Sequence, residues 1–158
     1  MAKEFHVRYL AENTRKIKPD NLKPWDDLPD TYKKANLEEA AYAIRILEAA
    51  GFGVRKAKGR PPIFNEFTDA DVELMAELEH GRWNIERLCD GWRPGPRNDD
   101  KRFHDCIAPW DKLSDGSDGV KCCDRDAVRA FPKILAKLGF EVYRKLGKKM
   151  SSKPKHKG

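Results

Sequence analysis

Residues 77–95 read ELEHGRWNIERLCDGWRPG, which begins with the periodicity of a helix and ends in glycines, a proline and a second tryptophan. At 100° per residue, Ala76, His80, Trp83 and Arg87 form one stripe of that helix. A separate apolar stripe, expected to pack into the core, consists of Leu74, Leu78, Ile85 and Leu88. A helix with two such stripes either lies between two layers of the fold or turns one stripe toward a pocket.

The His80 stripe has two interpretations. Trp83 can stack on a ring, Arg87 can bind phosphate or carboxylate, and His80 can donate or accept a proton near neutral pH. The same residues are equally compatible with a structural role, in which Trp83 fills space and His80 satisfies a buried carbonyl. The loop at 91–100, GWRPGPRNDD, favours a site, because functional residues often lie on loops held by a scaffold.

Two segments of the chain resemble each other. NLKPWDDLPDTYKKANLEEAAYAIRILEAAGF ends at Phe52, and CIAPWDKLSDGSDGVKCCDRDAVRAFPKILAKLGF ends at Phe140. Both contain Pro-Trp-Asp-x-Leu, a polar loop and an apolar-periodic helix that stops at Gly-Phe. Upstream, His6 is followed three residues later by Tyr9, as His80 is by Trp83. The pattern predicts two copies of one supersecondary unit, of which the second carries the longer loop.

The predicted fold is mostly α-helical, with short strands. We expect helices at 3–13, at 36–50 with an Asn36–Glu39 capping box and Gly51 as its stop, and at 68–89 with a Thr68–Asp71 cap. The expected buried stripe of the 36–50 helix is Leu37, Ala40, Ala41, Ile44 and Leu47.

The last helical region is expected to be capped by Asp124. Pro132 lies inside it, which predicts a kink or two short helices. Its apolar residues are Ala127, Val128, Phe131, Ile134, Leu135 and Leu138. Residues 53–55 and 141–143 are expected to pair as strands.

Composition narrows the functional classes. The 158 residues are 37% charged and 39% hydrophobic, which is typical of a globular protein, and no apolar run is long enough for a membrane span. The N-terminus lacks an apolar signal region, so we expect a cytoplasmic protein. The net charge is +6, but residues 144–158 alone hold seven basic residues and no acid. We therefore expect no specific nucleic-acid binding, and at most weak nonspecific contact through a flexible tail.

The four cysteines, 89, 106, 122 and 123, form no C-x-x-C pair and are expected to be free thiols. A zinc site built from His80, Cys89, His104 and Cys106 is an alternative, but its spacings match no standard ligand pattern. The sequence therefore predicts no metal and no cofactor.

The motif E-x-E-H-x-R-W-x-x-x-R-x-x-x-G-W-x-x-G, followed by His104, Pro109-Trp110-Asp111-x-Leu113, Lys121 and Asp124-Arg125, resembles the RyR domain, named after repeats in ryanodine receptors. The resemblance covers about 76–140, and residues 6–52 resemble a degenerate partner copy. Two positions depart from the family pattern: Pro94 replaces an aromatic residue and Asp105 replaces a proline.

The resemblance implies two pseudo-twofold-related helical repeats in one compact domain over 1–143. Repeat one would span about 3–55, the linker 53–67 and repeat two 68–143, followed by the tail at 144–158. It also implies a non-enzymatic sensor of a nucleotide-derived ligand, of the kind associated with anti-phage signalling, with an effector protein as a possible partner. The expected ligand-binding residues are His80, Trp83, Arg87, Trp92, Arg93, His104, Trp110, Lys121, Asp124 and Arg125.

Three alternative functions predict different sequence features. A protein–protein interaction module without a small-molecule ligand would place the tryptophans in the core and expose an apolar patch. Catalysis would require a nucleophile or an acid–base pair held by a third group, and no such constellation stands out. Binding of nucleic acid by the body of the protein is disfavoured because the positive charge lies in the tail.

Overall fold

The computed structural model describes residues 1–4, 6–7, 23–59, 66–116 and 119–145. Three long helices dominate it, so the prediction of a mostly α fold is confirmed. In chain order the elements are η2 (Trp25–Asp27), α2 (Asp30–Ala49), β1 (Phe52–Lys56), α3 (Asp69–Cys89), β2 (Arg93–Pro94), β3 (Phe103–His104), η3 (Trp110–Lys112), α4 (Val120–Lys137) and β4 (Phe140–Arg144).

Several predictions concern residues outside these ranges. Residues 2–4 and 6–7 are helical, but the rest of the predicted 3–13 helix, including Tyr9, lies outside the described residues. So do residues 60–65 of the predicted linker and residues 146–158 of the predicted tail. Arg144, the first residue of that tail, ends β4.

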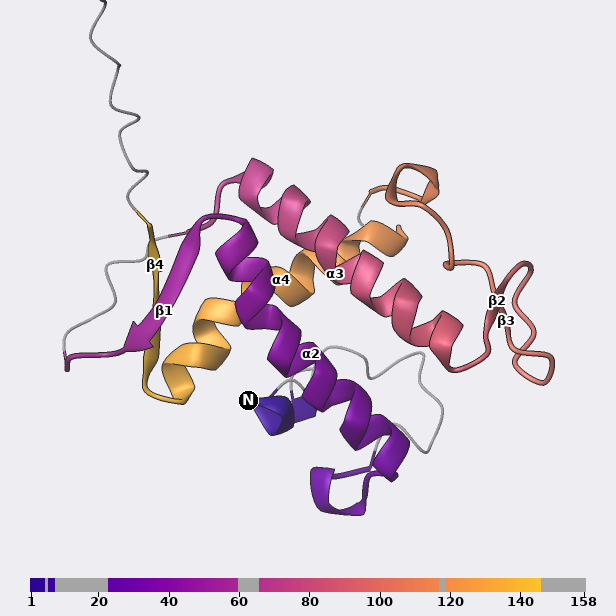
Figure 1. Cartoon of the computed structure of the whole chain (residues 1–158), viewed down its shortest axis with the longest axis horizontal. Helices are drawn as coiled ribbons and strands as arrows, with labels where there is room; N and C mark the ends of the chain where they lie inside the picture. The colour runs from indigo at the N-terminus through magenta and orange to yellow at the C-terminus, as the bar shows by residue number, and fades with distance from the viewer. Residues whose placement is uncertain (5, 8–22, 60–65, 117–118, 146–158) are drawn as a thin grey trace, which may run out of the picture.

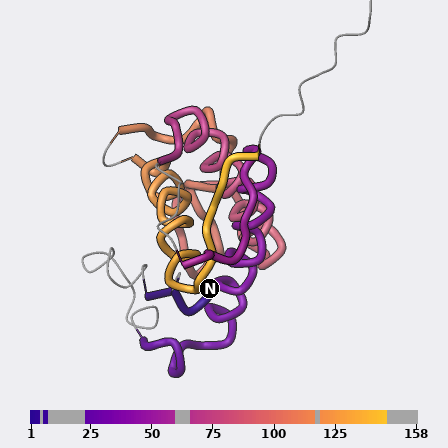
Figure 2. The backbone as a smooth tube through the Cα atoms, turned by 90° about the vertical axis from the view of Figure 1, so that its left-hand side faces the viewer, coloured from indigo at the N-terminus to yellow at the C-terminus, as the bar shows by residue number. Residues whose placement is uncertain are grey.

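β1 and β4 form an antiparallel pair at one end of the molecule, as Figures 1 and 2 show. Val54 pairs with Val142, and Gly53 pairs with Tyr143, so the strand pairing predicted from sequence is confirmed. Phe52 and Val142 are buried, because this face of the ribbon packs on the helices. The pair thereby joins the segment that follows α2 to the segment that follows α4.

α2 begins earlier than the sequence predicted. It starts at Asp30, after Pro29, and the side chain of Asn36 donates to the Tyr32 carbonyl at 2.8 Å within the helix. The predicted Asn36 capping box is therefore wrong: Pro29, with its fixed φ, immediately precedes the helix instead. The predicted stop is correct, since Gly51 has φ 83° directly after the C-cap.

The buried face of α2 is rotated relative to the prediction. Ala40 and Leu47 are buried as expected and Ile44 packs against the core, but Leu37 is 56% exposed and Ala41 is also exposed. The buried residues of this helix are Ala40, Ala43, Ile46 and Leu47.

α3 begins and ends where the sequence predicted. The Thr68 hydroxyl accepts from the Asp71 amide, and the Asp71 carboxylate accepts from the Thr68 amide, which completes a capping box. The Arg144 guanidinium also donates to Asp71, so the end of β4 is tied to the start of α3. This hydrogen bond holds the pKa of Asp71 below its usual value.

The predicted core face of α3 is wrong. Leu74, Ile85 and Leu88 are 45%, 64% and 50% exposed, and only Leu78 of that stripe packs against the core. The helix instead buries the stripe that contains Ala76 and His80, together with its neighbouring residues. Its buried residues are Val72, Met75, Ala76, Glu79 and His80.

α4 begins at Val120, so Asp124 lies within its second turn and does not cap it. Residues 120–137 form one helix that includes Pro132, which excludes the alternative of two short helices. Five of the six predicted apolar positions are buried, and Leu138 is 39% exposed beyond the last turn. They join α2, α3 and both long strands in one core, whose largest fully buried side chains are Phe52, Phe131, Ile46, Leu47, Met75 and Val128.

The loop after α3 forms the far end of the molecule in Figure 1 and contains β2 and β3. Gly91 (φ 82°) lets the chain reverse at the end of α3, and the Trp92 amide then donates to the Arg87 carbonyl at 2.9 Å. Arg93 pairs with Phe103 and Pro94 with His104. The loop therefore holds Trp92 and His104 near each other.

In the part of the chain that the structure describes, no helix has the length and apolarity that a membrane crossing requires.

Replacing Thr68 tests the cap of the helix that carries His80, Trp83 and Arg87 of the predicted site. Thr68→Ala removes the side-chain acceptor for the Asp71 amide and should lower the free energy of unfolding by about 1 kcal/mol. Thr68→Ser keeps a hydroxyl and should remain close to the original protein. Urea denaturation of all three proteins measures the difference, and equal stability of the alanine variant would contradict the cap.

Candidate functional site

His80 lies at the centre of the predicted site and is buried, with 3% of its surface exposed. Its Nε2 lies 2.9 Å from the Ala108 carbonyl oxygen, and its Nδ1 lies 3.2 Å from Oδ2 of Asp124. The Asn84 side-chain amide donates to the same Ala108 carbonyl at 3.0 Å. One imidazole thus joins α3, the segment before η3, and α4.

Burial alone would lower the pKa of His80, since it disfavours the charged ring. The hydrogen bonds to Asp124 and to the Ala108 carbonyl outweigh that effect and raise the pKa of His80 above its ordinary value. In the protonated form both ring N–H groups have an acceptor. His80 is therefore anchored through both ring nitrogens.

Aromatic rings extend from His80 in two directions. Trp83 stacks on His80 with ring centroids 5.8 Å apart, and His104 meets the edge of Trp83 at 5.0 Å. Trp92 also contacts His104, with ring centroids 5.8 Å apart. Trp110 lies 5.7 Å from His80 on the side toward α4. The helix, the loop and the segment around η3 thus each contribute a ring to one cluster.

A cavity of about 210 Å³ opens beside this cluster. Its walls are rings, thiols, one aliphatic residue and one carboxylate, contributed by His80, Trp83, His104, Cys106, Val120, Cys123 and Asp124. The volume is below the roughly 300–1,000 Å³ of pockets that enclose a whole drug-sized ligand. The cavity suits a single planar ring system, with the rest of such a ligand lying outside.

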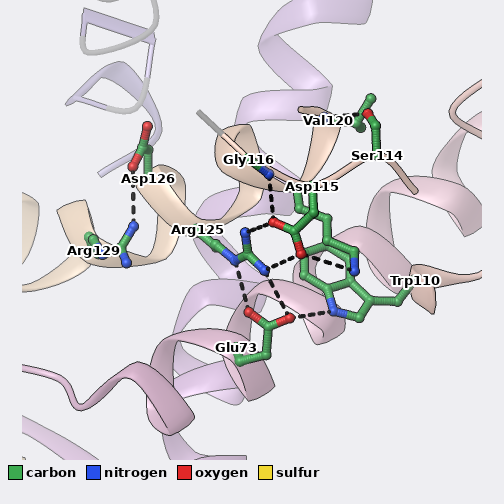
Figure 3. Close-up of polar contacts among 10 residues, drawn as sticks. Glu73, Trp110, Ser114, Asp115, Gly116, Val120, Arg125, Asp126 and Arg129 are labelled. Carbon is green, nitrogen blue, oxygen red and sulfur yellow. Dashed lines mark hydrogen bonds and ion pairs between the residues drawn. The ribbon is translucent and has the colours of Figure 1, made fainter. Parts of the chain in front are cut away.

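Trp110 is held by a second network, shown in Figure 3. Its indole N–H donates to Glu73 at 2.9 Å, and Arg125 lies between Glu73 and Asp115. Arg125 Nε donates to Glu73 at 2.8 Å and its Nη1 to Asp115 at 2.6 Å. The Lys121 ammonium lies 3.6 Å from Asp115 and 5.2 Å from the centre of the Trp110 ring.

These ion pairs change the expected role of two predicted residues. Hydrogen bonds from Arg125 hold the pKa values of Glu73 and Asp115 below their usual range, so both acids are ionised at neutral pH. Lys121 and Arg125 therefore have carboxylate partners already and serve to position Trp110. Arg87 lies over the Trp83 ring at 5.8 Å and pairs with Glu86.

The structure brings nine of the ten predicted residues into two adjoining groups. His80, Trp83, His104 and Asp124 line the cavity, and Arg87 and Trp92 contact its aromatic wall. Trp110, Lys121 and Arg125 form the neighbouring network. Arg93 is exposed on β2, and within the described residues its side chain makes no hydrogen bond, ion pair or ring contact with the other nine.

Several participants were missed by the sequence analysis. Glu73 lies seven residues, about two turns, before His80, so helical spacing alone could have placed it on the same face. Asn84, four residues after His80, could have been found in the same way. The contact between Arg97 Nη1 and His104 Nε2, at 2.8 Å, joins two loop residues and has no periodic signal.

The alternative zinc site does not assemble from its four predicted residues. Both ring nitrogens of His80 are already engaged, and Cys89 is exposed at the end of α3. In the described part of the chain, the group with candidate ligand atoms within 4.8 Å of one another is His104, Asp105 and Cys106. The four cysteines are free thiols, as predicted.

The His80–Asp124 pair predicts a pH dependence of stability. Because the folded pKa of His80 is raised, its stabilising contribution is fully present below about pH 6.5, the ordinary histidine pKa, and is lost as the pH rises through the folded pKa. Asp124→Asn should remove most of that slope. Urea unfolding from about pH 5.5 to 8.5 measures both proteins. The same slope in the variant would contradict the charged pair.

Comparisons with known proteins indicate one domain family. No curated protein matches the sequence significantly. A sequence model of the RyR domain matches residues 63–144, which include α3, the loop after it, η3, α4 and β4. The match covers more than half of the chain and includes every residue of both networks. The chain belongs to the RyR domain family.

Proposed function

We propose that this RyR domain is a non-enzymatic ligand-binding domain that holds the planar ring of a nucleotide-derived small molecule in the cavity beside Trp83. The observation that carries the proposal is the cavity itself. It is lined by His80, Trp83 and His104 and bordered by a loop tryptophan, Trp92, that contacts His104. Aromatic walls on a concave site of this size favour a stacked ring.

The cavity lining fits the base of a nucleotide better than its phosphates. It contains no lysine or arginine, and its one carboxylate, Asp124, can accept hydrogen bonds from ring or amino N–H groups. Phosphates would lie outside the cavity. Arg87, four residues after Trp83, and Arg93, next to Trp92, would contact them there. Lys121 and Arg125, paired with acids, would support the site through Trp110.

The contacts of the candidate catalytic groups favour binding over catalysis. His80 has both ring nitrogens engaged by protein acceptors, so it is poorly placed to shuttle a proton to a ligand. Burial raises the pKa of Cys106, and burial together with Cys122 raises the pKa of Cys123 to about 11. Both thiols therefore remain protonated at neutral pH and are weak nucleophiles.

We further propose that the site lies in the second of two pseudo-twofold-related repeats. The register of β1 and β4 supports this: Phe52 pairs with Arg144 and Lys56 pairs with Phe140. The flanking bonds match as well, since Ala57 N donates to Gly139 O and Lys145 N to Gly51 O, at 2.9 and 2.8 Å. Both ends of the ribbon are thus built in the same way.

A second likeness concerns the two histidines. His6 Nε2 lies 2.7 Å from the Lys23 carbonyl oxygen, two residues before Trp25, just as His80 contacts the carbonyl two residues before Trp110. When the two Gly-Phe ends are aligned, Asp124 corresponds to Asn36 in the first segment, so the acid of the second segment is missing there. The first copy would keep the frame, and the second would bind the ligand. A cytoplasmic role in nucleotide signalling, read out by an effector, is the corresponding biological proposal.

A thermal-shift and calorimetric screen with adenine, guanine, dinucleotide and cyclic-nucleotide ligands tests the proposal. A ligand at 100 times its Kd should stabilise the protein by about 2.7 kcal/mol. Arg87→Ala and Trp92→Ala should abolish or strongly weaken the shift. Arg129→Ala, which removes a half-exposed arginine of α4 outside the site, is the matched control and should behave as the original protein. Absence of a shift with every nucleotide would contradict the proposal.

The stability of Trp92→Ala separates a binding role from a core role. Trp92 lies on a loop and is only partly buried, so its removal should cost much less than the ~3–5 kcal/mol of a truncated core aromatic. Urea unfolding without ligand gives this value. A loss in the full core range would assign Trp92 to packing and would remove it from the proposed site.

A further inference from the structure

A groove of about 490 Å³ lies between α2 and α3, on a surface separate from the His80 cavity. Its lining includes Ala41 and Tyr42 of α2 and Ile85 and Cys89 of α3. Six charged side chains complete the lining. The complete lining is Lys34, Glu38, Ala41, Tyr42, Arg45, Arg82, Ile85, Glu86, Cys89 and Asp90.

The exposed apolar residues beside this groove are ones whose periodicity predicted burial. Ile85 is 64% exposed, Leu88 is 50% exposed, and Leu37, one turn before Ala41, is 56% exposed. Helical periodicity of apolar residues normally marks a face that is covered. Of these three, Ile85 lines the groove, and Leu88 and Leu37 directly adjoin lining residues in the chain. All three stay exposed within the single chain.

The charges around the groove are self-complementary. The lining holds three basic and three acidic residues, several of which are paired within the chain: Lys34 lies 3.7 Å from Glu38, and Arg82 lies 2.6 Å from Glu86. Arg45 on α2 and Asp90 at the end of α3 have no ion-pair partner among the described residues. They have opposite charges and lie on opposite walls of the groove.

We propose that this groove is the interface of a symmetric dimer in which a second copy of the chain covers it. A twofold interface places the same patch against itself, so Arg45 of one copy would meet Asp90 of the other at each end. The uncharged lining residues Ala41, Tyr42 and Ile85 of both copies would lie between those two ion pairs. A surface with an equal number of acids and bases suits such self-pairing better than a partner of one charge sign. This proposal is independent of the nucleotide site.

Sedimentation velocity of the full chain, over a dilution series up to about 100 μM, tests the proposal, since an interface with micromolar Kd would be populated there. The original protein should sediment as a dimer at the upper end, and Ile85→Glu should be monomeric. Leu74→Glu is the matched control, because Leu74 is an exposed leucine of the same helix outside the groove. It should remain dimeric. Far-UV circular dichroism and Tm confirm that both variants are folded.

A charge exchange tests the geometry of the dimer. Arg45→Glu or Asp90→Arg alone should weaken dimerisation about tenfold or more, because each places like charges together. The double variant should recover most of the affinity. A monomeric original protein at every concentration would overturn the proposal and leave the groove to another partner. A dimer that Ile85→Glu leaves intact, or single and double charge variants that weaken equally, would overturn it too.

Discussion

The second half of the molecule depends on one buried imidazole with two acceptors. His80 projects from α3 and holds the Ala108 carbonyl with one ring nitrogen and Asp124 with the other. Burial alone would disfavour the protonated ring, and the two acceptors outweigh that effect and raise the pKa of His80. Their positions fix the segment before η3 and the first turns of α4 relative to α3. Trp110 follows Ala108 by two residues, and the cavity walls come from α3, α4 and the stretch from His104 to Cys106.

Local chemistry accounts for the parts of the fold that the sequence predicted well. The Thr68–Asp71 cap needs only residues three apart, and the Gly51 stop needs only a residue that accepts positive φ. The β1–β4 pairing was predictable because a short extended segment follows each Gly-Phe. Helical periodicity predicted the wrong buried face for α3, which carries two candidate stripes. On α3, Leu74, Ile85 and Leu88 have the larger apolar signal, yet the helix buries the stripe with His80. Asp124 of α4 and the Ala108 carbonyl before η3 supply partners for the polar atoms of His80.

Motif residues predicted which side chains gather in the site, but not what each one does there. Trp83, His104 and Asp124 line one cavity although they come from three different segments. Spacing could not show that Arg125 and Lys121 are already paired with Asp115, since that contact joins the polar loop before α4 to the helix itself. Sequence spacing shows no acidic partner for Arg125 or Lys121, whereas in the structure both are paired with Asp115 and support Trp110. The same limit explains why Arg97, held against His104 by the loop, was not expected.

The central claim is that the aromatic cluster around His80 binds a ring rather than only filling space. Indole N–H resonances in a ¹⁵N–¹H correlation spectrum test it directly, because each of the four tryptophans gives its own signal. Trp83, Trp92 and Trp110 lie in the cluster, whereas Trp25 contacts His6. Titration with the nucleotide that gives the largest thermal shift should move the signals of Trp83 and Trp92 and leave that of Trp25 in place. Movement of Trp25 alone, or unchanged positions for all four at saturating ligand, would contradict the account.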